Sequence, residues 1–469
     1  MDSVFCDELV REIFHRLPPS CSATLSLVCK RWLRLLRLST SSLTLYFSPP
    51  SYNSATIRSL SSFLSQHTYL FWLSLTLPTD CATATADHVL RYTASSCPNL
   101  RHLQFMSAPV SPFSLFHLSN SCNHLSSLTI CLSRPLYFHW VKSFNSLKHL
   151  SLFLENPLTQ FNSLDVDEMD EILDVELGLE SLCLSGIQPR DFGLNLLWRN
   201  CKNIKKLQLN SCESLGDYAT FSGFIMRQKF LQEVELRTCR SIVDGVLMRL
   251  AENCVSLDFL LVYDGGSREG LHQFISQSKC KLRKLDFRLP LDLDNSHLIA
   301  ITENLNFRSL ESLRLQSCSL VTGEGLKVLG RVMGNGLEEL ALINCDVVER
   351  EFGLLTTLGQ DLERLRKLDL SYNEMLLDRE FISMLVSCNC LSELKLRGCN
   401  RLRSSSVNSM IRNCKLLQSI DILDCGGIEV EAVELFLLNS PQLRKFKVEQ
   451  SKISNVSRTW LTNKFIELV

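Results

Sequence analysis

Apolar residues recur along this chain in one short phrase, L-x-x-L-x-L, in which most x positions are polar. The phrase appears from Leu100 to beyond Leu443, and from Leu179 onward successive copies start 25 to 28 residues apart. A fixed period of this length is typical of a solenoid, in which each unit buries its apolar face only against its neighbours. The pattern therefore predicts a stack of repeats, and such stacks serve more often as binding surfaces than as catalytic pockets.

Segment 391–417 shows what one repeat contains. Leu394 and Leu396 alternate with Lys395, which is the period of a short half-buried strand. After a turn, apolar residues follow at helical spacing, at Val407, Met410 and Ile411. Strands are narrower than helices, so a stack with parallel strands on one side and helices on the other curves. We expect an α/β solenoid in the form of a horseshoe, with the parallel sheet on its concave face.

The phrase also divides the chain into regions. We expect regular repeats over residues 100–450, irregular first repeats and a junction over 41–99, and a cap over 451–469 that covers the apolar end of the stack. Segment 155–178 is an insertion with eight acids and no Lys or Arg, which predicts a loop or an irregular helix. Ordinary βα units of a doubly wound domain are the alternative, but they do not keep one phrase at one period over this length.

The N-terminal residues 1–40 follow a different pattern and predict a small all-α domain. Two helical stripes of apolar residues run through segment 5–37, and Pro18-Pro19 separates them. The first stripe is Leu9, Ile13, Phe14 and Leu17, and the second is Leu27, Val28, Trp32, Leu35 and Leu36. Because roughly 30 residues are too few to hold a large core, we expect this domain to be marginal until it docks on another protein.

Composition and charge exclude several classes of function. The 469 residues are 45% hydrophobic and carry a formal net charge of -1, which predicts an ordered chain with no bulk attraction to nucleic acid or anionic lipid. No apolar run reaches the ~18 residues that a membrane span needs. Residues 1–7 carry acid and no basic stretch, so we expect no secretory signal. We therefore expect neither a nucleic-acid partner nor a membrane.

The twenty cysteines are spaced by the repeat and contain no C-x-x-C. Many lie three residues after the last apolar position of a strand phrase or three residues before the first. Cysteine in these corner positions acts as a small buried apolar residue, and zinc sites need clustered ligands instead. We expect free buried thiols, which are typical of a reducing compartment, the cytoplasm or the nucleus.

The chain lacks the common catalytic motifs. G-x-x-x-x-G-K-[ST], G-x-S-x-G and H-E-x-x-H are absent, and the ten histidines are scattered along the sequence. The acids of segment 165–176 lack the glycine turn of a calcium loop, so we interpret them as a solvated acidic segment. The sequence therefore predicts no catalytic residue, no metal site and no cofactor.

The repeated phrase with its cysteine, as in Leu391 to Cys399, resembles the cysteine-containing leucine-rich repeat, whose period is roughly 26 residues. Segment 5–37 resembles an F-box, with the pattern L-P-x-E-[LI], I-[FL]-x-x-L-P and [LV]-V-C-[KR]-x-W. The matching positions are Glu8-Leu9, Ile13-Phe14, Leu17-Pro18 and the block from Val28 to Trp32. Phe5-Cys6 replaces the family's opening Leu-Pro. A helical cap for the stack is the alternative, but it would not need both a proline break and a Trp at this spacing.

An F-box followed by leucine-rich repeats is similar to the substrate receptors of SCF-type cullin–RING ubiquitin ligases, plant members in particular. The resemblance implies that the F-box binds a Skp-type adaptor, which bridges to the cullin, while the repeats hold a protein substrate for ubiquitination and proteasomal degradation. It implies no catalytic role for the chain itself. It assigns one set of residues to adaptor contact or to the F-box core, without separating the two: Leu9, Ile13, Phe14, Leu17, Pro18, Leu27, Val28 and Trp32.

The x positions around the last two leucines of each phrase point to the concave face and present a substrate surface. Most of them are charged, but one copy carries Phe259, Leu261 and Tyr263, which suggests an apolar contact patch. A register shifted by one residue would instead bury all three. Four basic residues on the same face complete the candidate set: Arg288, Arg314, Lys395 and Arg397.

Two further hypotheses remain open at the sequence level. The same basic residues could serve a small-molecule or hormone co-receptor of the F-box/leucine-rich-repeat type, although the loops here are short. The chain could also be a scaffold whose F-box is inactive.

Overall fold

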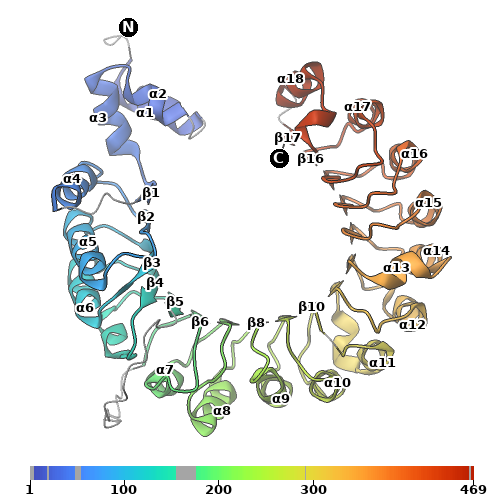
Figure 1. The fold of residues 1–469 in the computed structure, drawn as a ribbon, viewed down its shortest axis with the longest axis horizontal. Helices are drawn as coiled ribbons and strands as arrows, with labels where there is room; N and C mark the ends of the chain where they lie inside the picture. Colours follow the sequence, from blue (N-terminus) through green and yellow to red (C-terminus); the bar gives the residue numbers. More distant parts are fainter. Residues whose placement is uncertain are drawn as a thin grey trace. The chain divides into compact units, whose positions relative to one another are not determined.

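The structure is a computed structural model that describes residues 5–17, 21–47, 54–154, 176–290, 292–463 and 466–468. It separates into two compact units, Met1–Gln228 and Lys229–Val469. In each unit, parallel strands form one layer and helices form the other (Figure 1). The predicted α/β solenoid with a small all-α domain at its N-terminus is therefore confirmed. The acidic insertion predicted at 155–178 lies almost wholly outside the described residues.

Three short helices open the first unit: α1 (Asp7–Arg16), α2 (Ser22–Ser26) and α3 (Lys30–Ser39). They enclose a small core of their own. Its buried members and the apolar side chains packed partly against them are Val10, Phe14 and Leu35, then Leu25, Trp32 and Leu36. This domain lies at the β1 end of the first unit (Figure 1).

The second apolar stripe predicted from the sequence is not one helix. The chain turns between α2 and α3, where the Leu27 and Val28 backbone N–H groups bond the carbonyls of Thr24 and Leu25 at 3.2 and 3.3 Å. Cys29 is extended, and its thiol accepts a hydrogen bond from the Trp32 backbone N–H at 3.4 Å, which caps α3. The prediction missed this break because apolar spacing alone does not reveal a cysteine cap.

Arg31 ties the start of α1 to α3. Its guanidinium donates to the Asp7 carboxylate at 2.6 and 2.9 Å and to the Phe5 carbonyl at 2.7 Å. The hydrogen bond from Arg31 holds the pKa of Asp7 below its usual range. These bonds fix the first turn at the place where Phe5-Cys6 replaces the Leu-Pro of the F-box pattern.

The repeats of the first unit begin at β1, so strands already occupy the region predicted as irregular first repeats. The strands pair in parallel in sequence order, and they are β1 (Ser42–Tyr46), β2 (Trp72–Thr76), β3 (His102–Val110), β4 (Ser127–Leu132), β5 (His149–Leu154), β6 (Ser181–Ser185) and β7 (Lys206–Asn210). The helices opposite them are α4 (Ser54–Leu64), α5 (Thr83–Ser96), α6 (Pro112–Ser121), η2 (His139–Ser143), α7 (Leu194–Asn200) and α8 (Tyr218–Arg227).

The second unit repeats the same plan, and its strands line the inner side of its curved stack (Figure 1). The strands are β8 (Glu233–Arg237), β9 (Phe259–Tyr263), β10 (Lys284–Arg288), β11 (Ser312–Gln316), β12 (Glu339–Ile343), β13 (Lys367–Asp369), β14 (Glu393–Lys395), β15 (Ser419–Asp421), β16 (Lys445–Lys447) and β17 (Glu467–Leu468). The α-helices are α9 (Val243–Asn253), α10 (Arg268–Gln277), α11 (Asn295–Glu303), α12 (Gly323–Met333), α13 (Asp346–Arg350), α14 (Leu354–Asp361), α15 (Asp378–Ser387), α16 (Ser404–Asn413), α17 (Val430–Asn439) and α18 (Asn455–Asn463). The described part of the second unit also contains the 3-10 helices η3 (Leu305–Ser309) and η4 (Gln450–Lys452).

Ladders of leucine hold neighbouring repeats together. Leu285, Leu313, Leu340 and Leu368 are in register on adjacent strands, and each is at most 1% exposed. Every rung thus buries its apolar face on the next rung, as the repeat period predicts. At the other end of the second unit, β17 pairs in parallel with β16, so a strand continues the stack within the segment predicted as a cap.

The cysteines are free, and most are buried at the repeat corners. Several donate a hydrogen bond from sulfur to a carbonyl of the preceding repeat, as Cys399 does to Leu370 at 3.1 Å and Cys425 to Leu396 at 3.0 Å. Burial raises the pKa of the Cys201 thiol to about 12, so this thiol stays protonated and unreactive at neutral pH. The predicted structural role of these residues is confirmed.

Helix α11 begins with a capping box that makes unit stability depend on pH. Burial raises the pKa of Asp294, but hydrogen bonds from Ser296 and His297 outweigh burial and bring that pKa to about 2. A carboxyl with a lowered pKa stabilises the fold above its unfolded value of 3.8, and this contribution is lost as the pH falls toward 2.

We expect Asp294→Ala to lower the free energy of unfolding of the second unit by about 2 kcal/mol at pH 7. The difference from wild type should shrink as the pH falls from 4 toward 2. Urea unfolding followed by circular dichroism at several pH values measures both effects. Asp292→Ala, at an exposed neighbouring position, is the control and should leave the midpoint unchanged. An equal loss of stability at every pH would contradict the role given to the Asp294 charge.

Within the described segments, no helix is long and apolar enough to cross a bilayer.

Candidate functional site

The N-terminal helical domain presents apolar side chains to solvent along α1 and in the turn between α2 and α3. Leu9 and Ile13 on α1, together with Leu17 just after it, are 45%, 37% and 37% exposed. In the turn between α2 and α3, Leu27 is 85% exposed and Val28 is 55% exposed. We call these five residues the apolar row. A helical domain this small gains nothing from exposing five large apolar residues unless a partner covers them.

The remaining residues of the predicted adaptor set have other places. Phe14 is buried, with only 8% of its surface exposed. The Trp32 ring packs edge-on against it, with the ring centroids 5.4 Å apart. Both therefore belong to the core of the domain, although Trp32 remains partly exposed. Pro18 lies outside the described residues. The sequence did not separate surface residues from core residues within this set. The structure exposes five of them to solvent and places two in the core.

Residues 3–41 match the family model described as the F-box domain. The chain carries an F-box. The three helices with their own core and the apolar row all fall within the matched residues. Because the F-box encloses its own core, it is not simply a cap on the repeat stack, which was the alternative interpretation of this segment. An F-box supports a role in binding a Skp-type adaptor.

Solved leucine-rich-repeat and related structures are similar to most of the chain. The crystal structure of a TLR13–ssRNA13 complex has a TM-score of 0.47 at 16% identity, over 91% of this chain and 52% of that one, so this chain spans about half of its length. The Rad7 and Elc1 complex of yeast has a TM-score of 0.40 at 14% identity, over 91% and 90% of the two chains. LegL7 of Legionella pneumophila has a TM-score of 0.44 at 13% identity, over 60% and 96%. At these values the similarities carry no information about what this chain binds. The F-box at residues 3–41 and the parallel strand–helix repeats that follow it show that the chain is an F-box followed by leucine-rich repeats.

The second predicted surface lies on the inner face of the second unit, and its register is as predicted. On β9, Leu260 and Val262 are fully buried, while Phe259 and Tyr263 are half-buried. Leu261 is only 2% exposed, so the prediction of a threefold apolar patch is wrong at this residue. Leu261 lies in register between Glu235 and Asp286, whose strands flank it on both sides. The apolar patch therefore reduces to Phe259 and Tyr263.

Carboxylates pair with all four basic residues of the candidate set. Arg288 makes a bidentate contact with Asp286 at 2.7 and 2.9 Å. Lys395 pairs with Glu393 at 2.9 Å. Arg397 lies 3.4 Å from Asp421. With their charges shared in this way, these residues do not form the isolated basic pocket that a small anionic ligand needs, and the co-receptor hypothesis gains no support.

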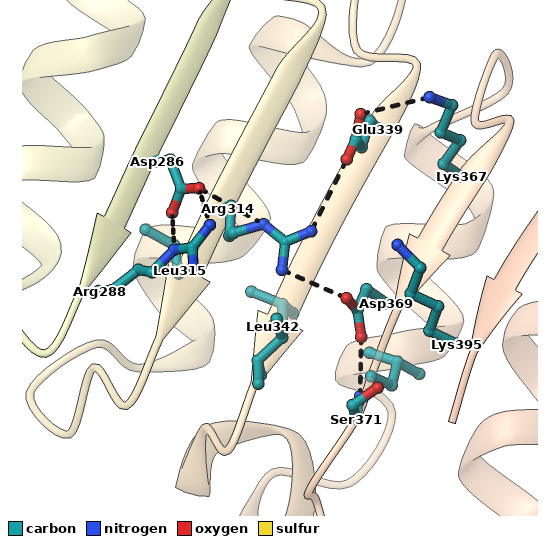
Figure 2. A network of polar contacts seen from close by, with 12 residues as sticks. Asp286, Arg288, Arg314, Leu315, Glu339, Leu342, Lys367, Asp369, Ser371 and Lys395 are labelled. Atoms are coloured by element: carbon teal, nitrogen blue, oxygen red, sulfur yellow. Dashed lines mark hydrogen bonds and ion pairs between the residues drawn. The ribbon is translucent and has the colours of Figure 1, made fainter. Parts of the chain in front are cut away.

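Arg314 is the centre of this network (Figure 2). Its guanidinium lies 3.6 Å from Asp286, 3.9 Å from Glu339 and 3.3 Å from Asp369. The contact with Asp369 passes over β12, where the small Ala341 leaves room for the long side chain. Since the Arg314 side chain is only 19% exposed, it acts chiefly to join four neighbouring repeats.

Sequence reasoning missed these carboxylate partners, although the sequence holds a signal for them. Acid-x-base pairs recur on single strands, as in Glu235-x-Arg237, Asp286-x-Arg288 and Glu393-x-Lys395. Because residues two apart in a strand lie on one face, this spacing predicts ion pairs along the strand. Distances of 2.8, 2.7 and 2.9 Å bear this out.

Among the residues that the structure describes, no three His, Cys, Asp or Glu side chains are grouped so that they could hold a metal ion.

Proposed function

We propose that this chain is the substrate-recognition subunit of an SCF-type E3 ubiquitin ligase. The observation that carries the proposal is the apolar row, which lies within the residues that match the F-box domain and is 37% to 85% exposed. An apolar row beside an intact small core supports docking on a Skp-type adaptor. Through that adaptor the chain would join a cullin–RING ligase in the cytoplasm or nucleus.

In this proposal the chain contributes proximity rather than catalysis. The F-box fixes one end of the chain to the ligase, while the repeats bind a protein substrate. Holding both in one complex raises the effective concentration of substrate lysines near the ubiquitin-carrying enzyme. The captured protein is then ubiquitinated and degraded by the proteasome.

The test is co-purification of the full chain after co-expression with a Skp-type adaptor and a cullin. We expect a stable complex in size-exclusion chromatography that contains all three proteins. With the proteasome blocked, mass spectrometry of the affinity-purified complex should also find ubiquitinated partners. A chain that elutes without adaptor and cullin would contradict the proposal and would favour the scaffold hypothesis.

We expect the double variant Phe259→Ala/Tyr263→Ala to weaken substrate capture severalfold while adaptor binding stays at the wild-type level. Both rings are half-buried on β9, so they can contact a partner without forming the repeat core. Quantitative pull-downs of the adaptor and of the captured proteins measure the two activities separately. Loss of both activities together would indicate misfolding and would contradict a role in substrate contact.

A further inference from the structure

The charges on the inner face of the second unit form two layers. Three aspartates lie deep on strands β10, β13 and β15, where the side chains of Asp286, Asp369 and Asp421 are only 9%, 11% and 11% exposed. Lysines and arginines from the same and neighbouring strands extend over them. The Asp421 carboxylate, for instance, forms ion pairs with the Arg397 guanidinium at 3.4 Å and with the Lys447 ammonium group at 3.9 Å.

The cations are the more exposed partners in these pairs. The Arg288, Arg397 and Lys447 side chains are 29%, 33% and 29% exposed, against 9% to 11% for the aspartates beneath them. The Lys367 and Lys395 side chains are 52% and 38% exposed, whereas those of their partners Glu339 and Glu393 are 28% and 27% exposed. The layer that meets solvent is therefore cationic, although the ion pairs balance much of the charge.

The same positions of the first unit carry far less charge, and β7 contributes one lysine, Lys206. Strands β1 to β6 contain no Asp, Glu, Lys or Arg, and their inner positions hold residues such as Ser74, Gln104 and Thr129. An uncharged inner face is thus compatible with this repeat. The charged layer on β10–β16 is a property of the second unit and needs an explanation of its own.

We propose that the inner face of β10–β16 binds an extended, Asp- and Glu-rich segment of the protein substrate. The proposal deepens the proposed function, on which it rests. The carboxylates of the segment would be met by the outer cations: Lys284, Arg288, Lys367, Lys395, Arg397 and Lys447.

The spacing of these cations suits an extended chain. They come from four strands, β10, β13, β14 and β16, or from the residues just after them. The first and last of these strands are six strand intervals apart, so at about 4.8 Å per interval the row is about 30 Å long, which matches roughly nine extended residues. A row of this length favours several carboxylates in succession over one compact anion. The deep aspartates hold the guanidinium groups of Arg288 and Arg397 in place. A guanidinium carries five N–H donors, which is more than one carboxylate accepts.

The test measures binding of a fluorescent peptide of about 12 residues, with alternating Glu and Ser, to the purified full chain in complex with its adaptor. Fluorescence anisotropy gives Kd at two salt concentrations. We expect Lys367→Glu/Lys395→Glu to raise Kd at least about tenfold, and higher salt to weaken binding of the wild type. The neutral variant Lys367→Gln/Lys395→Gln should raise Kd by a smaller factor.

The matched control reverses two charges on the helical side of the same repeats, with Arg331→Glu on α12 and Arg412→Glu on α16, both exposed. We expect its Kd to stay near the wild-type value. An equal loss of affinity in this control, or equal binding of a Gln–Ser peptide, would overturn the inference, as would unchanged affinity in the charge-reversal variant. Adaptor co-purification is followed in the same samples, because its loss in the wild type would overturn the proposed function instead.

Discussion

Leu27→Asp is expected to abolish adaptor co-purification and to raise Kd for the adaptor at least about 30-fold, because a buried hot-spot residue at an interface contributes roughly 2 kcal/mol or more. Leu27 is 85% exposed in the turn between α2 and α3, and it is absent from the small core of the F-box. A carboxylate there would be desolvated on docking without a partner. The F-box itself should remain folded, since no core contact is removed.

The control for Leu27→Asp is Leu438→Asp on α17, another exposed leucine at 72%. It adds the same charge to a similarly exposed surface outside the F-box and should leave adaptor binding intact. Isothermal titration calorimetry with purified adaptor gives both dissociation constants, and limited proteolysis reports whether the F-box is folded. Wild-type affinity in Leu27→Asp would remove the apolar row from the adaptor interface.

The sequence predicts the repeats well because their pattern is local and redundant. The alternation of Leu394 and Leu396 with Lys395 recurs in copy after copy, and each copy places its leucines on the same ladder. An error in one copy would be corrected by its neighbours, since strands of one solenoid share a register. The F-box was predictable for another reason, because its residues match a specific pattern in order and spacing.

Tertiary contacts decide what the sequence left open. The resemblance to the F-box placed Phe14 and Leu27 in one functional set, but only packing shows that the first is buried and the second exposed. Leu261 is buried because of the side chains on both neighbouring strands, which lie about 26 residues away in either direction. The contact of Arg314 with Asp369 spans 55 residues and crosses an intervening strand. Patterns within one repeat contain no information about such contacts.

Trp32→Ala is expected to abolish adaptor co-purification by a different route, through unfolding of the F-box. The Trp32 ring packs on Phe14 at 5.4 Å, and the whole core consists of a few side chains from three short helices. Truncating a large aromatic residue in a core costs about 3 kcal/mol, which is comparable to the stability that so small a core can supply. The leucine ladders of the repeats do not include Trp32, so their fold should survive.

Hydrogen exchange measured by mass spectrometry distinguishes this route from that of Leu27→Asp. In Trp32→Ala the amides of α1 and α3 should lose protection while β2 to β16 keep it, and circular dichroism should stay near wild type. In Leu27→Asp the same amides should stay protected. Trp32→Phe restores an aromatic ring against Phe14, so it should recover most of the protection and most of the adaptor binding. Adaptor co-purification that persists in Trp32→Ala would contradict the assignment of this domain as the adaptor-binding part of the chain.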